Sequence, residues 1–315
     1  MPLTPQAKVI VDAASAAFPG LGTEVLDATE ARRLLADRPA PAVDPIPVAD
    51  VRERWIPGPH GAPEVRVRIY RPASAATPAP IVIFCHGGGF VICSLDSHDQ
   101  FCRVMANGTD AIVVSVDYRQ APEHRFPAAA EDAYAALRWV ADHAESLGGD
   151  PACVVVAGDS AGGNLATVMA LMARDRGGPR IARQLLLYPM LDPACATDSY
   201  RENAEGYFTT AAHLRWYWSQ YLDSHDGTDP YANPLCADLS GLPPAHIVTA
   251  EFDPLRDEGE SYGQRLTQAG VAVEIHRYKG MFHGFMSMAG NLPEAAQANA
   301  AAFSVVRAAY AERRP

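Results

Sequence analysis

Gly158-Asp159-Ser160-Ala161-Gly162-Gly163 is the most informative segment of the sequence, because it stands between an apolar run at 153–157 and a helical pattern beginning at 164. A serine in the pattern Gly-x-Ser-x-Gly between a strand and a helix is typical of the sharp turn that carries a nucleophile. Small residues at Gly158 and Gly162 let the strand and the helix approach closely around a strained serine. A glycine-rich phosphate loop is the alternative, but no lysine or arginine follows in the first helical turn.

Short apolar runs on both sides of this motif are typical of strands buried on both faces of a parallel sheet. They lie at 81–85, 111–116, 185–188 and 247–250, with a half-buried strand predicted at 65–70 and a last strand at 271–278. Longer helical patterns separate several of them, at 127–147, 163–174 and 254–269, and a C-terminal helix is predicted at 294–313. This alternation predicts an α/β fold, with a mostly parallel central sheet flanked by helices.

Two further regions stand apart from this alternation. Helical patterns at about 9–17 and 23–36 precede a proline-rich linker at 39–47. The aromatic-rich stretch between Asp192 and Asp229 contains no predicted buried strand, and it follows the carboxyl end of one. That stretch is either a helix packed on the core or a lid that walls a substrate pocket. We therefore expect cap helices in residues 1–45 and a catalytic domain at 46–315, with a cap insertion at about 193–228.

A second motif, His86-Gly87-Gly88-Gly89-Phe90, directly follows the run at 81–85. Three glycines leave the backbone amides unshielded, and acyl transfer requires N–H donors aimed at the oxyanion of its tetrahedral intermediate. We expect Gly87, Gly88 and Ala161 to supply these donors. His86 precedes the nucleophile in the chain, so we expect it to hold the loop rather than to act as a base.

In α/β folds with a nucleophilic serine in a Gly-x-Ser-x-Gly turn, the acid follows the serine in the chain and the histidine base follows the acid. His283 lies in a glycine-flanked loop beyond the last predicted strand, where its side chain can reach over the sheet edge. Asp253 follows the run at 247–250 and precedes a proline, which favours an extended backbone at the aspartate. The other candidates are expected to make helix-cap, surface or sheet contacts: Glu251, Asp257 and His276.

Together these motifs resemble the hormone-sensitive-lipase-like branch of the α/β-hydrolase esterases, bacterial family IV, in its GDSAG subgroup. The matching segments are HGGGF at 86–90, DYRQAPEHRFPAA at 117–129, GDSAGG at 158–163, YPMLD at 188–192, DPLRDE at 253–258 and HGF at 283–285. One departure is Gln120, where the family usually has leucine. The resemblance implies an α/β-hydrolase fold with a helical cap, and cis peptide bonds before Pro122 and Pro127.

The resemblance also implies Ser160 as nucleophile, Asp253 and His283 as its partners, and oxyanion donors at Gly87, Gly88 and Ala161. The expected function is a serine carboxylesterase that hydrolyses esters with acyl chains of roughly two to eight carbons through an acyl-enzyme. Two alternatives stay open: an amidase or peptidase, and a non-catalytic small-molecule receptor on the same fold. No metal or organic cofactor is expected.

The composition of the chain indicates which classes of partner and which cellular compartment to expect. The 315 residues carry a formal charge of −11, which argues against a nucleic-acid partner because phosphate binding requires a basic surface. Six scattered cysteines without a Cys-x-x-Cys pair indicate reduced thiols, and no apolar run approaches the roughly 20 residues of a membrane helix. We therefore expect a cytoplasmic protein without stable membrane insertion. Its last strand is a candidate edge for homodimer pairing.

Overall fold

A central sheet of eight strands organises the molecule, and the computed structural model describes residues 2–38, 44–224 and 226–312. The strands are β1 (Asp50–Ile56), β2 (Val65–Arg71), β3 (Ala79–Cys85), β4 (Ile112–Asp117), β5 (Gly149–Asp159), β6 (Arg183–Leu187), β7 (Ala245–Phe252) and β8 (Val273–Phe282). They lie in the order β1-β2-β4-β3-β5-β6-β7-β8. Strand β2 is antiparallel to β1 and β4, and the pairs from β4 to β8 are parallel. This confirms the mostly parallel α/β sheet predicted from the sequence.

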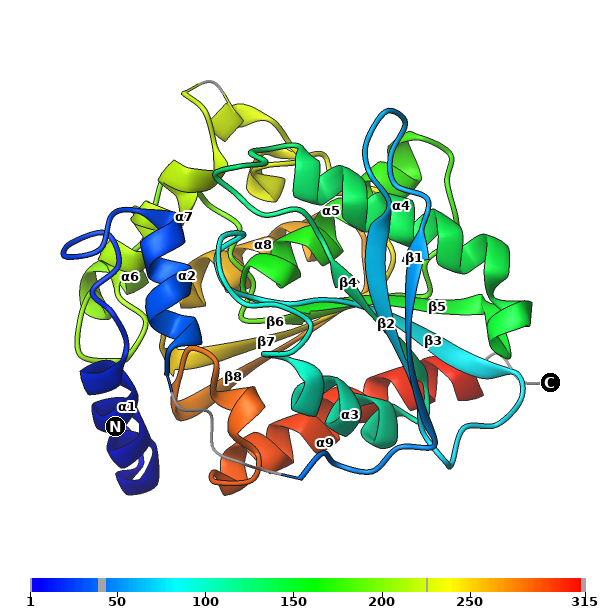
Figure 1. Cartoon of the computed structure of the whole chain (residues 1–315), viewed down its shortest axis with the longest axis horizontal. Coiled ribbons are helices and arrows are strands. Elements are labelled where there is room, and N and C mark those ends of the chain that lie inside the picture. The colour runs from blue at the N-terminus through cyan, green and yellow to red at the C-terminus, as the bar shows by residue number, and fades with distance from the viewer. Residues whose placement is uncertain (1, 39–43, 225, 313–315) are drawn as a thin grey trace.

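Helices cover both faces of the sheet, as Figure 1 shows. The longer ones are α3 (Asp99–Thr109), α4 (Ala128–His143), α5 (Ala161–Asp175), α8 (Arg256–Gln268) and α9 (Pro293–Ala311). Helices α3 and α9 share one apolar core with one face of the sheet, and α4, α5 and α8 share a second core with the other face. Because both faces are covered, every residue of β3 is buried, which explains its uninterrupted apolar sequence.

The parallel strands deliver the predicted site residues to one edge of the sheet. His86 directly follows β3, Ser160 follows β5, Asp253 follows β7 and His283 follows β8. In an open parallel sheet the carboxyl ends of the strands face the ligand-binding side. The topology therefore brings together four segments that span almost 200 residues of sequence.

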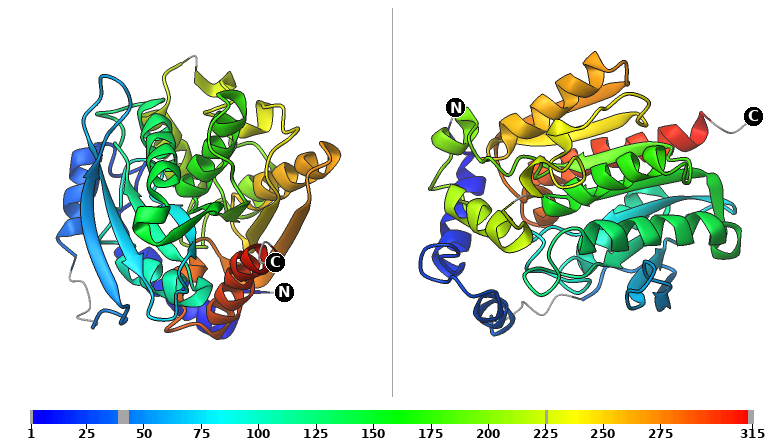
Figure 2. Two further views of the ribbon diagram at one scale, coloured as in Figure 1. Left: turned by 90° about the vertical axis from the view of Figure 1, so that its right-hand side faces the viewer. Right: turned by 90° about the horizontal axis from the view of Figure 1, so that it is seen from above.

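Helices from two distant parts of the chain gather at this same end of the molecule, visible at the left of both Figure 1 and the right-hand view of Figure 2. They are α1 (Pro5–Ala17), α2 (Ala28–Ala36), α6 (Asp198–Glu202) and α7 (Ala211–Tyr221). The indole nitrogen of Trp216 on α7 donates a hydrogen bond of 2.9 Å to the Leu26 carbonyl. Arg32 of α2 reaches the Val91 carbonyl at 2.7 Å and forms an ion pair with Glu123. The N-terminal helices are thus tied to the insertion and to the loop after β3.

The structure corrects three details of the predicted elements. Strand β1 and helix α3 are present in the structure but are not predicted from the sequence. The second helix begins at Ala28 rather than near residue 23. Residues 20–25 instead form a turn with a positive φ of 77° at Gly22, and Asp27 caps the helix through the Glu30 amide. Helix α9 ends at Ala311, before the predicted end at residue 313, which lies outside the described part of the chain, as do linker residues 39–43.

Short 3-10 helices complete the fold: η1 (Glu145–Leu147), η2 (Asp226–Thr228), η3 (Pro234–Cys236) and η4 (Phe285–Met288). The peptide bonds before Pro122 and Pro127 are cis, which confirms that expectation. Among the helices of residues 2–38, 44–224 and 226–312, none combines the length and apolar character needed to cross a membrane. The six cysteines, all within the described residues, form no disulfide.

Candidate active site

Ser160 occupies the sharp turn between β5 and α5, in the strained conformation that its motif predicts. Its φ is 55° and its ψ is −119°, outside the ordinary α and β regions. A side-chain carbon at Gly158 would collide with the carbonyl of Gly162, and one at Gly162 would collide with the carbonyl of Cys85. Both glycines are therefore required by close backbone packing. The Ser160 amide donates to Leu187 at 2.9 Å, which ties the turn to β6.

His283 and Asp253 form a buried pair from two neighbouring strands. The Nδ1 atom of His283 lies 2.8 Å from Oδ2 of Asp253. The Asp253 side chain is fully buried, and its second oxygen accepts a 2.8 Å hydrogen bond from the Leu255 amide. The ring of Tyr188 meets the His283 ring edge-on, with centroids 4.9 Å apart. These contacts fix the imidazole and leave its Nε2 nitrogen as the one suited to proton transfer.

Ser160 and His283 line the same cavity, which has a volume of about 240 Å³. Its apolar wall is formed by Phe18, Ile92, Phe208, Leu214, Tyr217 and Met288. Within the described residues no hydrogen bond joins the Ser160 hydroxyl to His283, and such bonds are often long before substrate binds. A larger cavity of about 570 Å³, beside Arg174, Arg180 and Arg183, contains none of the predicted catalytic residues.

Residues from the two segments predicted to form a cap contribute directly to the cavity wall. Phe18, at the end of α1, packs edge-on against Phe208 of the insertion, with ring centroids 5.3 Å apart, and its ring centroid lies 5.4 Å from that of His213. Burial lowers the pKa of His213 to about 4, so this histidine is neutral at pH 7. The two parts of the chain predicted to form the cap therefore meet over the serine in one mostly apolar surface.

The glycine loop after β3 requires one revision of the predicted oxyanion donors. The Gly87 amide donates a 2.8 Å hydrogen bond to Oδ1 of Asp159, so it is already engaged inside the protein. Gly88 and Gly89 line the cavity together with Ser160, and both have positive φ angles, of 102° and 60°. The loop geometry therefore favours the amides of Gly88 and Gly89 over that of Gly87. The motif alone does not reveal which two of its three amides face the cavity.

Asp159 and His98 form a half-buried polar pair that lines the cavity beside this loop. The Asp159 carboxylate lies 3.3 Å from Nε2 of His98, which stands just before α3, and it accepts the Gly87 amide. Burial by itself raises the pKa of Asp159, but the charge of His98 and its hydrogen bond outweigh burial and hold that pKa below the usual value. Neither Asp159 nor His98 was singled out from the sequence, although Asp159 adjoins the nucleophile.

His86 has the structural position that the sequence analysis expected for it. Its Nδ1 atom lies 2.7 Å from the Gly87 carbonyl, and its ring stacks on Tyr118 at a centroid distance of 4.4 Å. Complete burial is the main cause that lowers the pKa of His86 to about 4. A buried neutral imidazole of this kind braces the loop.

The rejected candidates for acid and base lie outside the cavity wall. Glu251 accepts a 2.7 Å hydrogen bond from the Gly280 amide, and Asp257 pairs with Arg256 and accepts the Ser199 amide at 2.7 Å. His276 projects from β8 with half of its side chain exposed. His276 has the surface position predicted for it, whereas the contact of Glu251 is to the neighbouring strand β8 and is not one of the helix-cap or surface contacts predicted for Glu251 and Asp257.

Gln120, where the family pattern usually has leucine, supports the cavity in a way the sequence analysis missed. Its side-chain amide donates to the carbonyls of Ile92 and Cys93, at 3.0 and 2.9 Å. Ile92 and Cys93 both line the cavity, and Cys93 has a positive φ of 70°. A leucine cannot form these hydrogen bonds, so Gln120 gives this chain a polar clamp on one wall of its site.

Comparisons with known proteins agree with this geometry. A family model described as the alpha/beta hydrolase fold matches residues 82–287. The esterase LipI of Mycobacterium tuberculosis is 46% identical over 274 residues, covering 85% of this chain and 84% of that protein. An ethyl acetate hydrolase of Pseudomonas putida is 38% identical over 297 residues, covering 91% and 92% of the two chains.

A solved structure gives the same result at the level of the fold. The hyperthermophilic esterase of the archaeon Pyrobaculum calidifontis superposes with a TM-score of 0.89 at 40% sequence identity. The match covers 98% of this chain and 99% of that one, so it includes the N-terminal helices as well as the sheet.

Proposed function

Since this chain belongs to the α/β-hydrolase fold family and is a carboxylic ester hydrolase like its named relatives, we propose that it cleaves esters through an acyl-enzyme on Ser160. One observation carries the proposal. His283 is held by a 2.8 Å hydrogen bond to the buried Asp253 and lines the same small cavity as the serine of the strained turn. Nucleophile, base and orienting acid are the set that acyl transfer requires.

The reaction proceeds in two halves. Nε2 of His283 takes the hydroxyl proton of Ser160 while the serine oxygen attacks the ester carbonyl. The amides of Gly88, Gly89 and Ala161 stabilise the oxyanion, and the N-terminus of α5 favours the same negative charge. His283 then protonates the leaving alcohol, and in the second half it activates a water that releases the acid. Asp253 holds the imidazole tautomer and stabilises the imidazolium throughout.

The size and lining of the cavity indicate the substrate class. Its volume of about 240 Å³ lies just below the usual range for sites that bind drug-sized ligands, and its wall is mainly aliphatic and aromatic. We propose that residues 1–45 and the insertion at 193–228 act as the cap that encloses the acyl group. Soluble esters of short and medium acyl chains are the substrates that fit such a site.

Turnover and covalent labelling of the same variants test the mechanism. A series of p-nitrophenyl esters from acetate to laurate measures kcat/KM for wild type and Ser160→Ala. A fluorophosphonate probe followed by peptide mass spectrometry identifies the modified residue. Ser287→Ala is a matched control, because Ser287 lines the same cavity while its hydroxyl donates to the Gly284 carbonyl at 2.9 Å.

We expect Ser160→Ala to lose turnover and labelling together, and Ser287→Ala to keep both. Turnover retained in Ser160→Ala, or labelling at another residue, contradicts the proposal. A p-nitroanilide of the same acyl group separates ester from amide hydrolysis, and we expect the ester to be the better substrate by far.

We also propose that two copies pair through β8, which pairs within the described chain only with β7 and lies at the edge of the sheet. Light scattering coupled to size exclusion distinguishes a dimer from a monomer. A cytoplasmic location likewise stays a proposal, supported by six cysteines that form no disulfide.

A further inference from the structure

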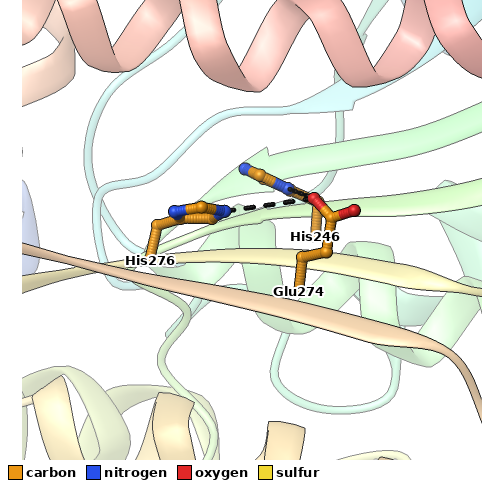
Figure 3. A group of neighbouring side chains, drawn as sticks. All are labelled: His246, Glu274 and His276. Atoms are coloured by element: carbon orange, nitrogen blue, oxygen red, sulfur yellow. Dashed lines mark hydrogen bonds and ion pairs between the residues drawn. The ribbon is translucent and has the colours of Figure 1, made fainter.

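Three side chains with metal-binding groups gather on the outer strands of the sheet. His246 projects from β7, and Glu274 and His276 project from β8, two residues apart and therefore on one face of the strand. Glu274 is the direct register partner of His246, and His276 is the partner of the next residue on that face, Val248. Figure 3 shows the Glu274 carboxylate beside both imidazole rings. The sheet itself thus places the three groups together.

The distances within this His-Glu-His cluster are short. The Nδ1 atom of His246 lies 3.2 Å from a carboxylate oxygen of Glu274, and Nε2 of His276 lies 3.9 Å from the same oxygen. One ligand atom from each residue falls within 4.8 Å of the other two. Ligand atoms of a tetrahedral zinc ion, with bonds of about 2.0–2.2 Å, stand roughly 3.3 Å apart. Small rotations of the two exposed side chains, Glu274 and His276, bring the set to that spacing.

His246 is the buried member of the cluster, with a side chain only 2% exposed. Its Nδ1 atom faces Glu274, so this nitrogen is the one placed to bind a metal. The rings of His246 and His276 stack with centroids 4.9 Å apart. Imidazole binds metals in its neutral form, so the site requires both histidines to be neutral.

From this arrangement we propose that His246, Glu274 and His276 bind a zinc ion, with water in the fourth position. Two imidazole nitrogens and one carboxylate oxygen are a ligand set that zinc accepts, and the exposed side of the cluster leaves room for the water. Hard cations such as Mg²⁺ and Ca²⁺ prefer all-oxygen ligands and do not suit this set.

The position of the cluster gives the ion a structural effect on the enzyme. It joins β7 to β8, and these two strands lead directly to Asp253 and His283. None of the three ligands lines the catalytic cavity, so the ion takes no part in the ester chemistry. Bound zinc ties together the strands that present the acid and the base, which stabilises the folded state by mass action.

Calorimetric titration of the metal-free full-length chain with zinc chloride tests the site. Wild type, His276→Ala and Glu274→Gln are compared, and both variants change exposed side chains, so the fold is retained. His60→Ala is the matched control, because it removes an exposed histidine from another part of the surface. The same titration on Ser160→Ala makes the result independent of the catalytic mechanism. Thermal unfolding with and without zinc gives a second readout.

We expect one zinc ion per chain and a higher Tm in its presence, in wild type, His60→Ala and Ser160→Ala alike. His276→Ala and Glu274→Gln weaken binding by at least about 10-fold and lose the rise in Tm. The proposal is overturned if wild type shows no binding, if the two cluster variants bind zinc as wild type does, or if Mg²⁺ raises the Tm equally.

Discussion

Asp253 and His283 meet through a 2.8 Å hydrogen bond although 30 residues separate them in the chain. Each directly follows one of two adjacent parallel strands, β7 and β8, so the register of those strands sets the bond. The aspartate has no exposed surface and holds its other oxygen on the Leu255 amide. The orientation of the base is thus built into the sheet, and a single isosteric change at Asp253 isolates its contribution.

Asp253→Asn is expected to lower kcat by about 10⁴-fold while leaving the fold intact. The amide has the shape of the carboxylate, but it presents the wrong hydrogen-bonding group to His283 and carries no charge to stabilise the imidazolium. The measurement is kcat for p-nitrophenyl butyrate, with circular dichroism to check folding. Asp257→Asn is the control, because Asp257 lies nearby on α8 but contacts Arg256 and Ser199. A comparable loss of kcat in both variants would refute the assigned roles.

Gln120→Leu is expected to loosen the cavity wall and to destabilise the protein by about 1–3 kcal/mol. The carbonyls of Ile92 and Cys93 lose their side-chain donor, and leucine offers no replacement. Urea denaturation measures the free energy of unfolding, and the p-nitrophenyl ester series measures selectivity, which we expect to broaden. Gln268→Leu, at an exposed position on α8, serves as control. Wild-type stability and selectivity in Gln120→Leu would show that the clamp is dispensable.

Phe18→Ala is expected to shift the acyl preference toward longer chains. The Phe18 ring forms part of the cavity wall and packs on Phe208, so its removal lengthens the space available to the acyl group. The ratio of kcat/KM for p-nitrophenyl decanoate to that for butyrate should rise by about 10-fold. Val9→Ala, on the exposed side of the same helix α1, should leave the ratio unchanged.

Deletion of residues 1–45 tests the proposed cap more severely. It removes Phe18 from the cavity and Arg32 from the loop after β3, so we expect activity or selectivity to suffer more than the central sheet does. Far-UV circular dichroism and the ester series report these two effects separately. An unchanged chain-length preference after the deletion would argue against a cap role.

Stability is expected to fall as the pH drops from about 6.5 to about 4. Burial lowers the pKa of His86 and of His213 from 6.5 to about 4. In that interval the unfolded chain binds protons at both residues and the folded protein does not, so acid favours unfolding. Each histidine adds at most about 1.4 kcal/mol per pH unit to the slope. The pKa of Asp159 is held below its ordinary value of 3.8, so the stability that its ionised carboxylate contributes is lost only under more acidic conditions.

His213→Gln should reduce the slope of the unfolding free energy against pH by up to about 1.4 kcal/mol per pH unit, because the glutamine side chain does not titrate. Urea denaturation at pH 7, 5.5 and 4 gives the slope directly. His60→Gln, at an exposed turn, is the control and should leave the slope as in wild type. An unaltered slope in His213→Gln would mean that this histidine is protonated in the folded protein as readily as in the unfolded one.

The parallel core could be predicted from the sequence because burial on both faces imposes a simple pattern. In β3 no position faces water, so the strand appears as an uninterrupted apolar run. Strand β1 escaped prediction because it lies at the opposite edge of the sheet, and four of its seven residues are exposed. Helix α3 escaped because it begins with Asp99 and Gln100 and ends in Asn-Gly-Thr, so only its buried stripe is apolar.

The site could be predicted as far as local motifs reach. Ser160 and His283 stand in short sequences whose backbone demands are visible in the neighbouring glycines. The hydrogen bond from the Gly87 amide to Asp159 joins two segments that are 72 residues apart in the chain, so a local sequence motif cannot predict it. The Gln120 clamp is similar, since its partners lie 27 and 28 residues upstream.

The place of the base on the outermost strand has a consequence for how the enzyme fails on heating. Residues 273–279 of β8 are exposed or half-buried, and within the described chain the strand is hydrogen-bonded to β7 alone. Edge segments with few buried contacts open at a lower free energy than the core of the same domain. We therefore expect His283 to lose its alignment while β3, β5 and their helices remain folded. The temperature of half-inactivation should lie below the midpoint of global unfolding, and the gap between them measures the local stability of one strand.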